Sequence, residues 1–87
     1  MDEAIKNYSV YILLCSDKTL YTGIAFDVQK RLLEHNGSPK GAKYTRGRRP
    51  LELVYSEQCE DKSSALKREH AIKKLTRLQK ETLLQTQ

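Results

Sequence analysis

The chain has 87 residues, which is enough for one domain with a single modest hydrophobic core and too few for a second. The net charge of +5 is moderate and does not by itself indicate an anionic partner, so the distribution of charge matters more. No apolar run approaches the length of a membrane span, and the polar, acidic start MDEAIKNY differs from a signal peptide, which argues against a membrane or secreted protein.

The cysteine pattern also favours a cytoplasmic protein. Cys15 and Cys59 lie in or beside predicted strands and lack the spacing of a metal site, so we expect buried free thiols. We therefore expect a cytoplasmic, monomeric protein in which residues 1–87 form a single domain.

Residues 8–25, YSVYILLCSDKTLYTGIA, predict an antiparallel hairpin, because two runs of aromatic, β-branched and aliphatic residues flank a polar stretch at 16–18. A three-residue loop places Cys15 opposite Thr19, so the numbers of paired residues sum to 34. Odd-numbered residues of both strands then share one face of the sheet.

That register turns two tyrosines toward the same side. Tyr11 and Tyr21 share a face beside Gly23, which has no side chain, and we expect them to form a polar platform rather than core. The alternative is that both are ordinary strand residues.

A helix is predicted over residues 27–36, with Asp27 as its N-cap and Asn36-Gly37 as a left-handed exit. The apolar residues expected to face the sheet are Val28, Leu32 and Leu33. Arg31 and His35 are four apart and share one face of this helix. The alternatives are a solvated arginine and a histidine favoured by the helix dipole.

The segment that follows is strongly basic. Residues 38–50, SPKGAKYTRGRRP, predict a loop or short helical turn that could follow a phosphate backbone, with Tyr44 available to stack on a base or ribose. The five cations are Lys40, Lys43, Arg46, Arg48 and Arg49. A solvated loop is the alternative, and the absence of any acid in this segment counts against it.

Residues 51–57, LELVYSE, alternate Leu51, Leu53 and Tyr55 with Glu52, Val54 and Ser56 and predict a third strand. The elements together predict an α+β fold, an α/β sandwich with helices flanking a three-stranded antiparallel sheet in the order ββαβαα. The strands are expected near residues 7–15, 19–25 and 51–57, and the helices near 27–36, 62–75 and 77–85.

The last two helices carry their own signals. Asp61 or Ser63 can cap the first, and Thr76 with Gln79 predicts a capping box for the second. The residues expected to face inward are Ala65, Leu66, Ile72, Leu75, Leu78, Leu83 and Leu84.

Glu69 falls at the edge of this inward stripe, where an ionised carboxylate is costly unless a cation or several donors meet it. The plain explanation is a salt bridge to Arg31, Lys62 or Lys73.

The tripeptides Ser9-Val10-Tyr11 and Tyr21-Thr22-Gly23, followed by Arg31, His35 and Glu69, resemble the active-site set of the GIY-YIG nuclease superfamily. The resemblance covers about residues 7–80 and is closest to small stand-alone bacterial members, with the N-terminal nuclease domain of an excinuclease as a larger relative. Two features depart from the pattern: Ser9 stands at its first glycine, and no asparagine follows Asn36, whereas many members carry one beyond the glutamate.

The resemblance implies hydrolysis of DNA phosphodiester bonds, in DNA repair or recombination. We expect little sequence specificity, because a domain of this size has little surface for reading bases. The resemblance also implies that Tyr11 is the base, that Tyr21 orients water or phosphate, and that His35 accepts the proton from Tyr11. Arg31 would bind a nonbridging oxygen, and Glu69 would hold one Mg²⁺ or Mn²⁺.

Two other classes of function remain open at this point. The same basic face could belong to a noncatalytic module that binds DNA or RNA, with the missing asparagine leaving hydrolysis inactive. The basic loop could also dock an acidic protein partner, although no residue specifically favours that function.

Overall fold

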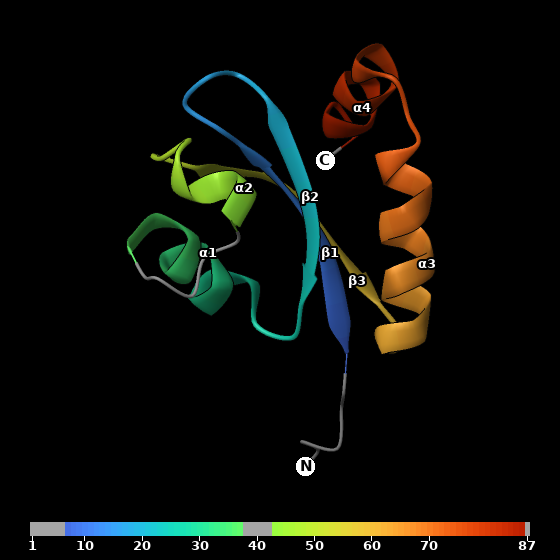
Figure 1. Ribbon diagram of the computed structural model, residues 1–87. Coiled ribbons are helices and arrows are strands. Elements are labelled where there is room, and N and C mark those ends of the chain that lie inside the picture. Colours follow the sequence, from blue (N-terminus) through green and yellow to red (C-terminus); the bar gives the residue numbers. More distant parts are fainter. Residues whose placement is uncertain (1–6, 38–42, 87) are drawn as a thin grey trace.

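We describe residues 7–37 and 43–86 in a computed structural model of the chain (Figure 1). The elements in chain order are β1 (Tyr8–Leu14), β2 (Leu20–Ala25), α1 (Val28–Gly37), α2 (Lys43–Arg46), β3 (Glu52–Cys59), α3 (Lys62–Lys73) and α4 (Arg77–Leu84). The strands form one antiparallel sheet in the order β2-β1-β3. The expected α+β fold is confirmed, and the basic segment contributes the short helix α2.

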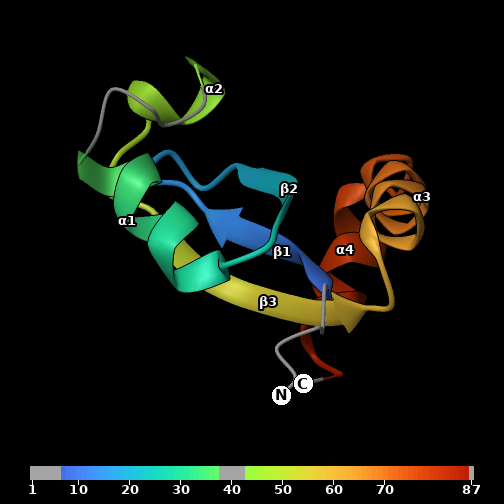
Figure 2. The ribbon, with the colours of Figure 1, turned by 90° about the horizontal axis from the view of Figure 1, so that it is seen from below.

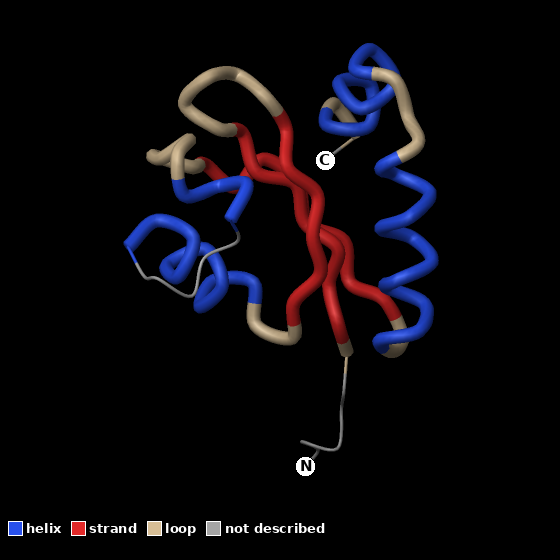
Figure 3. Tube along the Cα trace, in the orientation of Figure 1, coloured by secondary structure: helices blue, strands red, loops and turns tan. Residues whose placement is uncertain are grey.

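Helices cover both faces of the sheet. In Figures 1 and 2, α1 and α2 lie on one side and α3 and α4 on the other, so that the sheet is the middle layer. Figure 3 shows the strands in red between helices in blue, and within the sheet β1 is the central strand and β2 forms one edge. Among residues 7–37 and 43–86, no helix has the length and apolarity needed to cross a membrane.

The register of the hairpin is as predicted. Tyr11 pairs with Gly23, and the Cys15 amide donates to the Thr19 carbonyl at 2.9 Å. Lys18 adopts a left-handed φ of 73°, which costs a residue with a Cβ about 1–2 kcal/mol. The Asp17 carboxylate accepts from the Thr19 amide at 3.1 Å and its hydroxyl at 2.6 Å, and these bonds stabilise a loop that has no glycine.

Alternate residues of β1 are buried on opposite faces. On the α3 side, Val10 and Ile12 pack with Ala65 and Ile72, and none of these four exposes measurable surface. On the α1 side, the buried cluster consists of Tyr11, Leu13, Cys15 and Leu51. Both cysteines are free, but only Cys15 is fully buried.

An irregularity in β3 changes the face of one predicted residue. Ile12 pairs with Tyr55 and Leu13 with Leu53, so Val54 is an additional residue on the β3 side. Such a bulge reverses the alternation of side chains. Tyr55 therefore joins the α3 side, and the prediction that it shares a face with Leu51 and Leu53 is wrong.

Three leucines predicted to be buried are exposed: Leu33 at 73%, Leu66 at 46% and Leu78 at 72%. Each lies beside the stripe that contacts the sheet, which Val28 and Leu32 provide in α1. The predicted caps at Asp27, Asp61 and Thr76 are confirmed, including the capping box with Gln79.

The exit of α1 differs from the prediction, because neither Asn36 nor Gly37 has a positive φ. Asn36 instead ties α1 to the start of β3. Its Nδ2 donates to the Leu51 carbonyl at 3.0 Å, and its Oδ1 accepts from the Leu51 amide at 2.7 Å.

Candidate functional site

Tyr11 lies directly against its cross-strand partner Gly23. A Cβ at position 23 would lie 2.7 Å from the Tyr11 hydroxyl oxygen and 2.8 Å from its Cζ atom, so only glycine leaves room for this ring. Tyr11 is 1% exposed. The expected pairing with Tyr21 is present, with ring centroids 6.4 Å apart, but Tyr11 is part of the core, and the expectation of a platform outside the core is wrong for this residue.

The Tyr11 hydroxyl begins a buried chain of hydrogen bonds. It lies 2.8 Å from His35 Nε2, and His35 Nδ1 lies 2.8 Å from Thr45 Oγ1. His35 comes from α1 and Thr45 from α2, and neither residue exposes measurable surface. Two helices are thus joined to the central strand through one imidazole ring.

Arg31 fixes the direction of these bonds. Its guanidinium donates to the Tyr11 hydroxyl, and an arginine can only donate. The phenol oxygen accepts that bond and directs its own proton to His35 Nε2, so we assign the ring proton of His35 to Nδ1, facing Thr45. Arg31 also pairs with Glu34 at 2.9 Å, and this hydrogen bond is the main reason why its pKa is raised.

The site keeps both titrating groups neutral at neutral pH. Burial, aided by the charge that Tyr21 would carry, raises the pKa of Tyr11 to about 12, although Arg31 opposes the shift. Burial also lowers the pKa of His35 to about 4, with further lowering by the charges of Arg31 and Arg49. His35 is therefore a hydrogen-bond acceptor at Nε2 rather than a cation.

A stack of side chains connects the site to the hairpin loop. The Tyr21 ring lies 5.3 Å from the His35 ring and 5.7 Å from the Tyr44 ring, and the Arg48 guanidinium lies 3.9 Å from the Tyr44 ring centroid. Arg48 also pairs with Asp17 at 2.9 Å. Tyr44, which is expected to stack on a base, is 40% exposed and contacts Tyr21 and Arg48 within the protein.

The five cations predicted to bind phosphate differ in their contacts and exposure. Arg48 is held by the stack, and Arg49 Nε donates to the His35 carbonyl. Lys43 and Arg46 are exposed on α2. Lys40 lies outside the described residues. Of the described cations in this segment, Lys43 and Arg46 are the exposed ones.

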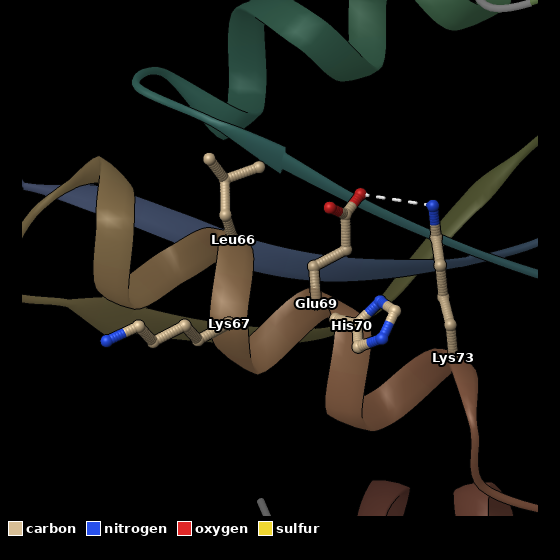
Figure 4. Close-up of a pocket in the computed structure, with 5 residues that line it drawn as sticks. All are labelled: Leu66, Lys67, Glu69, His70 and Lys73. Carbon is tan, nitrogen blue, oxygen red and sulfur yellow. Dashed lines mark ion pairs between the residues drawn. The ribbon is translucent and has the colours of Figure 1, made fainter.

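Glu69 comes from the side of the sheet opposite to Arg31 and His35. It lies on α3, with 19% of its side chain exposed, and pairs with Lys73 Nζ at 3.3 Å (Figure 4). It lines a depression of about 490 Å³ together with Leu66, Lys67, His70 and Lys73, all from α3. Lys73 was one of the three partners considered for it.

The predicted site residues lie on both sides of the edge strand β2. α1 and α3 lie on either side of β2 (Figure 2), and both contact that strand. The charge of Glu69 contributes weakly to the raised pKa of Tyr11, so the two groups are within electrostatic range. Arg31 lines a different depression from Glu69. The structure therefore brings Tyr11, Tyr21, Arg31 and His35 together and leaves Glu69 across β2.

Thr45 was not predicted from the sequence. Its neighbours Tyr44 and Arg46 attracted attention as aromatic and basic groups, whereas an uncharged threonine in a basic segment carries no comparable signal. Its contact joins residues 35 and 45, which are not related by any helical or strand period.

Comparison with known proteins supports one family. The model of the GIY-YIG catalytic domain matches residues 7–82. A UPF0213 protein of Desulfotalea psychrophila is 57% identical over 75 residues, which are 86% of this chain and 68% of that protein. A UPF0213 protein of Natronomonas pharaonis is 51% identical over 78 residues, covering 90% of this chain and 91% of the relative.

Two solved structures have the same fold. The solution NMR structure of a UPF0213 protein from Bacillus halodurans is 44% identical, with a TM-score of 0.61 over 93% of this chain and 85% of that one. The protein EF2693 from E. faecalis is also 44% identical, with a TM-score of 0.64 over the same shares of both chains. Because the family model spans nearly the whole sequence and the relatives match at high identity, the chain belongs to the GIY-YIG domain family and, within it, to the small UPF0213 proteins.

Proposed function

We propose that this protein is a divalent-metal-dependent endonuclease that hydrolyses DNA phosphodiester bonds with little sequence specificity. The observation that carries the proposal is the buried Tyr11 hydroxyl, held between the guanidinium of Arg31 and the neutral imidazole of His35. A phenol that accepts a hydrogen bond from a cation and donates one to a proton acceptor is suited to relay a proton from an attacking water. Membership in the GIY-YIG family supports the same chemistry.

The relay moves one proton in each of two linked steps. Tyr11 passes its proton to His35 Nε2 as it accepts one from water, so that no isolated phenolate has to form in a buried site. A phosphodiester bound to Arg31 offsets the positive charge that lowers the pKa of His35. Substrate binding would thus make His35 a stronger base when it is needed.

The remaining residues position the substrate. The guanidinium of Arg31 can fork onto a nonbridging oxygen and stabilise charge that develops there. Tyr21, half-buried beside His35, would orient water or phosphate through its hydroxyl. Lys43 and Arg46 would contact the phosphate backbone without recognising its bases.

The donors present fit a hydrated hard cation. The described residues contain no group of three or more His, Cys, Asp or Glu side chains that could hold a metal, and the ligand in this proposal is the single carboxylate of Glu69. Mg²⁺ commonly binds through one or two carboxylates and keeps several waters. When bound, such an ion would stabilise the charge on the leaving oxygen. Lys73 would have to move aside, and its side chain is 54% exposed.

Cleavage assays with Glu69→Gln test the proposal. The unmodified protein should cut supercoiled, single-stranded or branched DNA with Mg²⁺ or Mn²⁺ and not in EDTA. Glu69→Gln keeps the shape of the side chain and should abolish cleavage and weaken Mn²⁺ binding, while DNA affinity and melting temperature change little. Glu81→Gln is the matched control, because Glu81 also forms an i,i+4 pair, with Arg77 at 2.8 Å, but lies on α4.

A noncatalytic DNA- or RNA-binding module is the second candidate. The ion pair between Glu69 and Lys73 favours it, because that pair meets the needs of the carboxylate without a metal. Parental cleavage by Glu69→Gln, or no effect of divalent metal on any form of DNA, would reject the nuclease and leave the binding module.

A further inference from the structure

Phe26 is exposed beside the candidate site. It lies at the end of β2, just before α1, and 58% of the residue is exposed. It lines a depression of about 360 Å³ together with Tyr8, Lys30 and Arg31. The Tyr8 ring contacts it edge-on, with centroids 5.7 Å apart and planes at 65°. An exposed aromatic ring is thus supported in place at the rim of the site.

Lys30 and Arg31 bring positive charge to the depression beside Phe26. Two acids also line the depression, but Glu34 is paired with Arg31 at 2.9 Å, and the carboxylate of Asp27 accepts from the Lys30 amide at 3.1 Å as the N-cap of α1. Lys30 is exposed, and Lys62 Nζ lies 6.0 Å from the Tyr8 ring centroid. Lys30 and Lys62 are the lysines that a phosphate bound beside these two rings would meet.

Arg31 joins this depression to the buried Tyr11 and His35. The same guanidinium donates to the Tyr11 hydroxyl and borders the surface around Phe26. A nucleotide whose phosphate lies on Arg31 would therefore have its base, or the base of its neighbour, within reach of Phe26. Aromatic side chains in such positions stack on bases without regard to sequence.

We propose that Phe26 is the stacking platform for an unpaired base of DNA, next to the phosphate held by Arg31. The faces of a base in a duplex are covered by its neighbours, so only a single-stranded or splayed nucleotide can place a base on this ring. The proposal rests on the proposed function in one respect, namely that a phosphate of the DNA lies on Arg31. It assigns single-stranded or branched DNA as the substrate class.

Tryptophan fluorescence tests stacking without cleavage. The chain has no tryptophan, so Phe26→Trp introduces a single tryptophan, which can be excited selectively and keeps an aromatic face. Titration with a short oligothymidylate in EDTA should quench its emission. An abasic oligonucleotide of equal length, which has phosphates but no bases, should not. Leu78→Trp is the control, since Leu78 is 72% exposed on α4 across the sheet, and its emission should stay unchanged.

Affinity provides the second measurement. Phe26→Ala should weaken binding of the oligothymidylate by roughly tenfold, as expected for one stacked base, and leave duplex affinity unchanged. Equal quenching by the abasic strand, binding without quenching, or no binding to single strands would each overturn the proposal. Cleavage without quenching would reject stacking on residue 26 and retain the proposed nuclease. Quenching without cleavage would support stacking and reject the nuclease.

Discussion

The two faces of the sheet bury different side chains, although one strand supplies both. On the α3 side, Val10 and Ile12 meet Ala65 and Ile72 in a fully apolar contact. On the α1 side, Tyr11 meets His35, and its buried polar atoms are satisfied by one another, by Arg31 and by Thr45. Burial of polar groups costs free energy unless each finds a partner.

The two sides of the sheet therefore differ in role, one contributing mainly to stability and the other holding the reactive groups. The apolar side can stabilise the fold in proportion to the area that it buries. The polar side gains less from burial, but it holds a phenol and an imidazole at a set distance with shifted pKa values, as reactive groups require. The following four predictions test this division, from the largest expected effect to the smallest.

Ile72→Ala should be the most damaging change to the fold. Ile72 is fully buried on the apolar side, and removing its side chain should lower the free energy of unfolding by about 2–5 kcal/mol in urea titrations. Leu66→Ala on the same helix should change it by less than about 1 kcal/mol, since Leu66 is 46% exposed. Similar losses for both variants would contradict the assigned core.

Acidification should destabilise the polar side through His35. The unfolded chain binds a proton on this residue below about pH 6.5, whereas the folded protein does so only below about pH 4. Between these values the unfolded state holds more protons, so the contribution of His35 is complete above pH 6.5 and is lost as the pH falls toward 4, by about 3 kcal/mol.

Chemical denaturation across this range would measure the effect. His35→Gln should flatten the pH dependence, and His70→Gln, which alters an exposed histidine, should leave it unchanged. A parental slope in His35→Gln would show that other groups cause it.

Gly23→Ala should disturb the site by crowding. Its Cβ would fall within 3.0 Å of two Tyr11 atoms, and that ring is buried and hydrogen-bonded, so we expect a loss of about 1–3 kcal/mol and reduced cleavage. Gly47→Ala is the control, because no atom lies within 4 Å of its added Cβ. Thermal melts and cleavage rates should separate the two, and equal behaviour would argue against the close approach of Tyr11.

Thr45→Val should have the smallest effect on stability, about 1–2 kcal/mol, because it leaves His35 Nδ1 without its partner. Nitrogen chemical shifts of the imidazole should show a single tautomer in the unmodified protein and a mixture in the variant. Thr45→Ser keeps the hydroxyl and should restore the single tautomer. An unchanged tautomer in Thr45→Val would remove Thr45 from the relay.

Patterns within short segments were predicted well. The hairpin register follows from two strand-like runs and a three-residue loop, and the caps at Asp61 and Thr76 follow from side chains that bond to amides three residues away. The face of Tyr55 was mispredicted because the bulge in β3 depends on pairing with β1, which lies more than 40 residues earlier in the chain.

The sequence by itself determined the candidate residues Tyr11, Tyr21, Arg31, His35 and Glu69, because their types and spacing carry the family pattern. Only the tertiary structure decided how they are partnered. It joined His35 of α1 to Thr45 of α2 and placed Tyr44 against Tyr21 of β2. Local periods and caps act between near neighbours in the chain, as in the pair that Glu69 forms with Lys73 four residues later, whereas these two contacts depend on how separate elements dock.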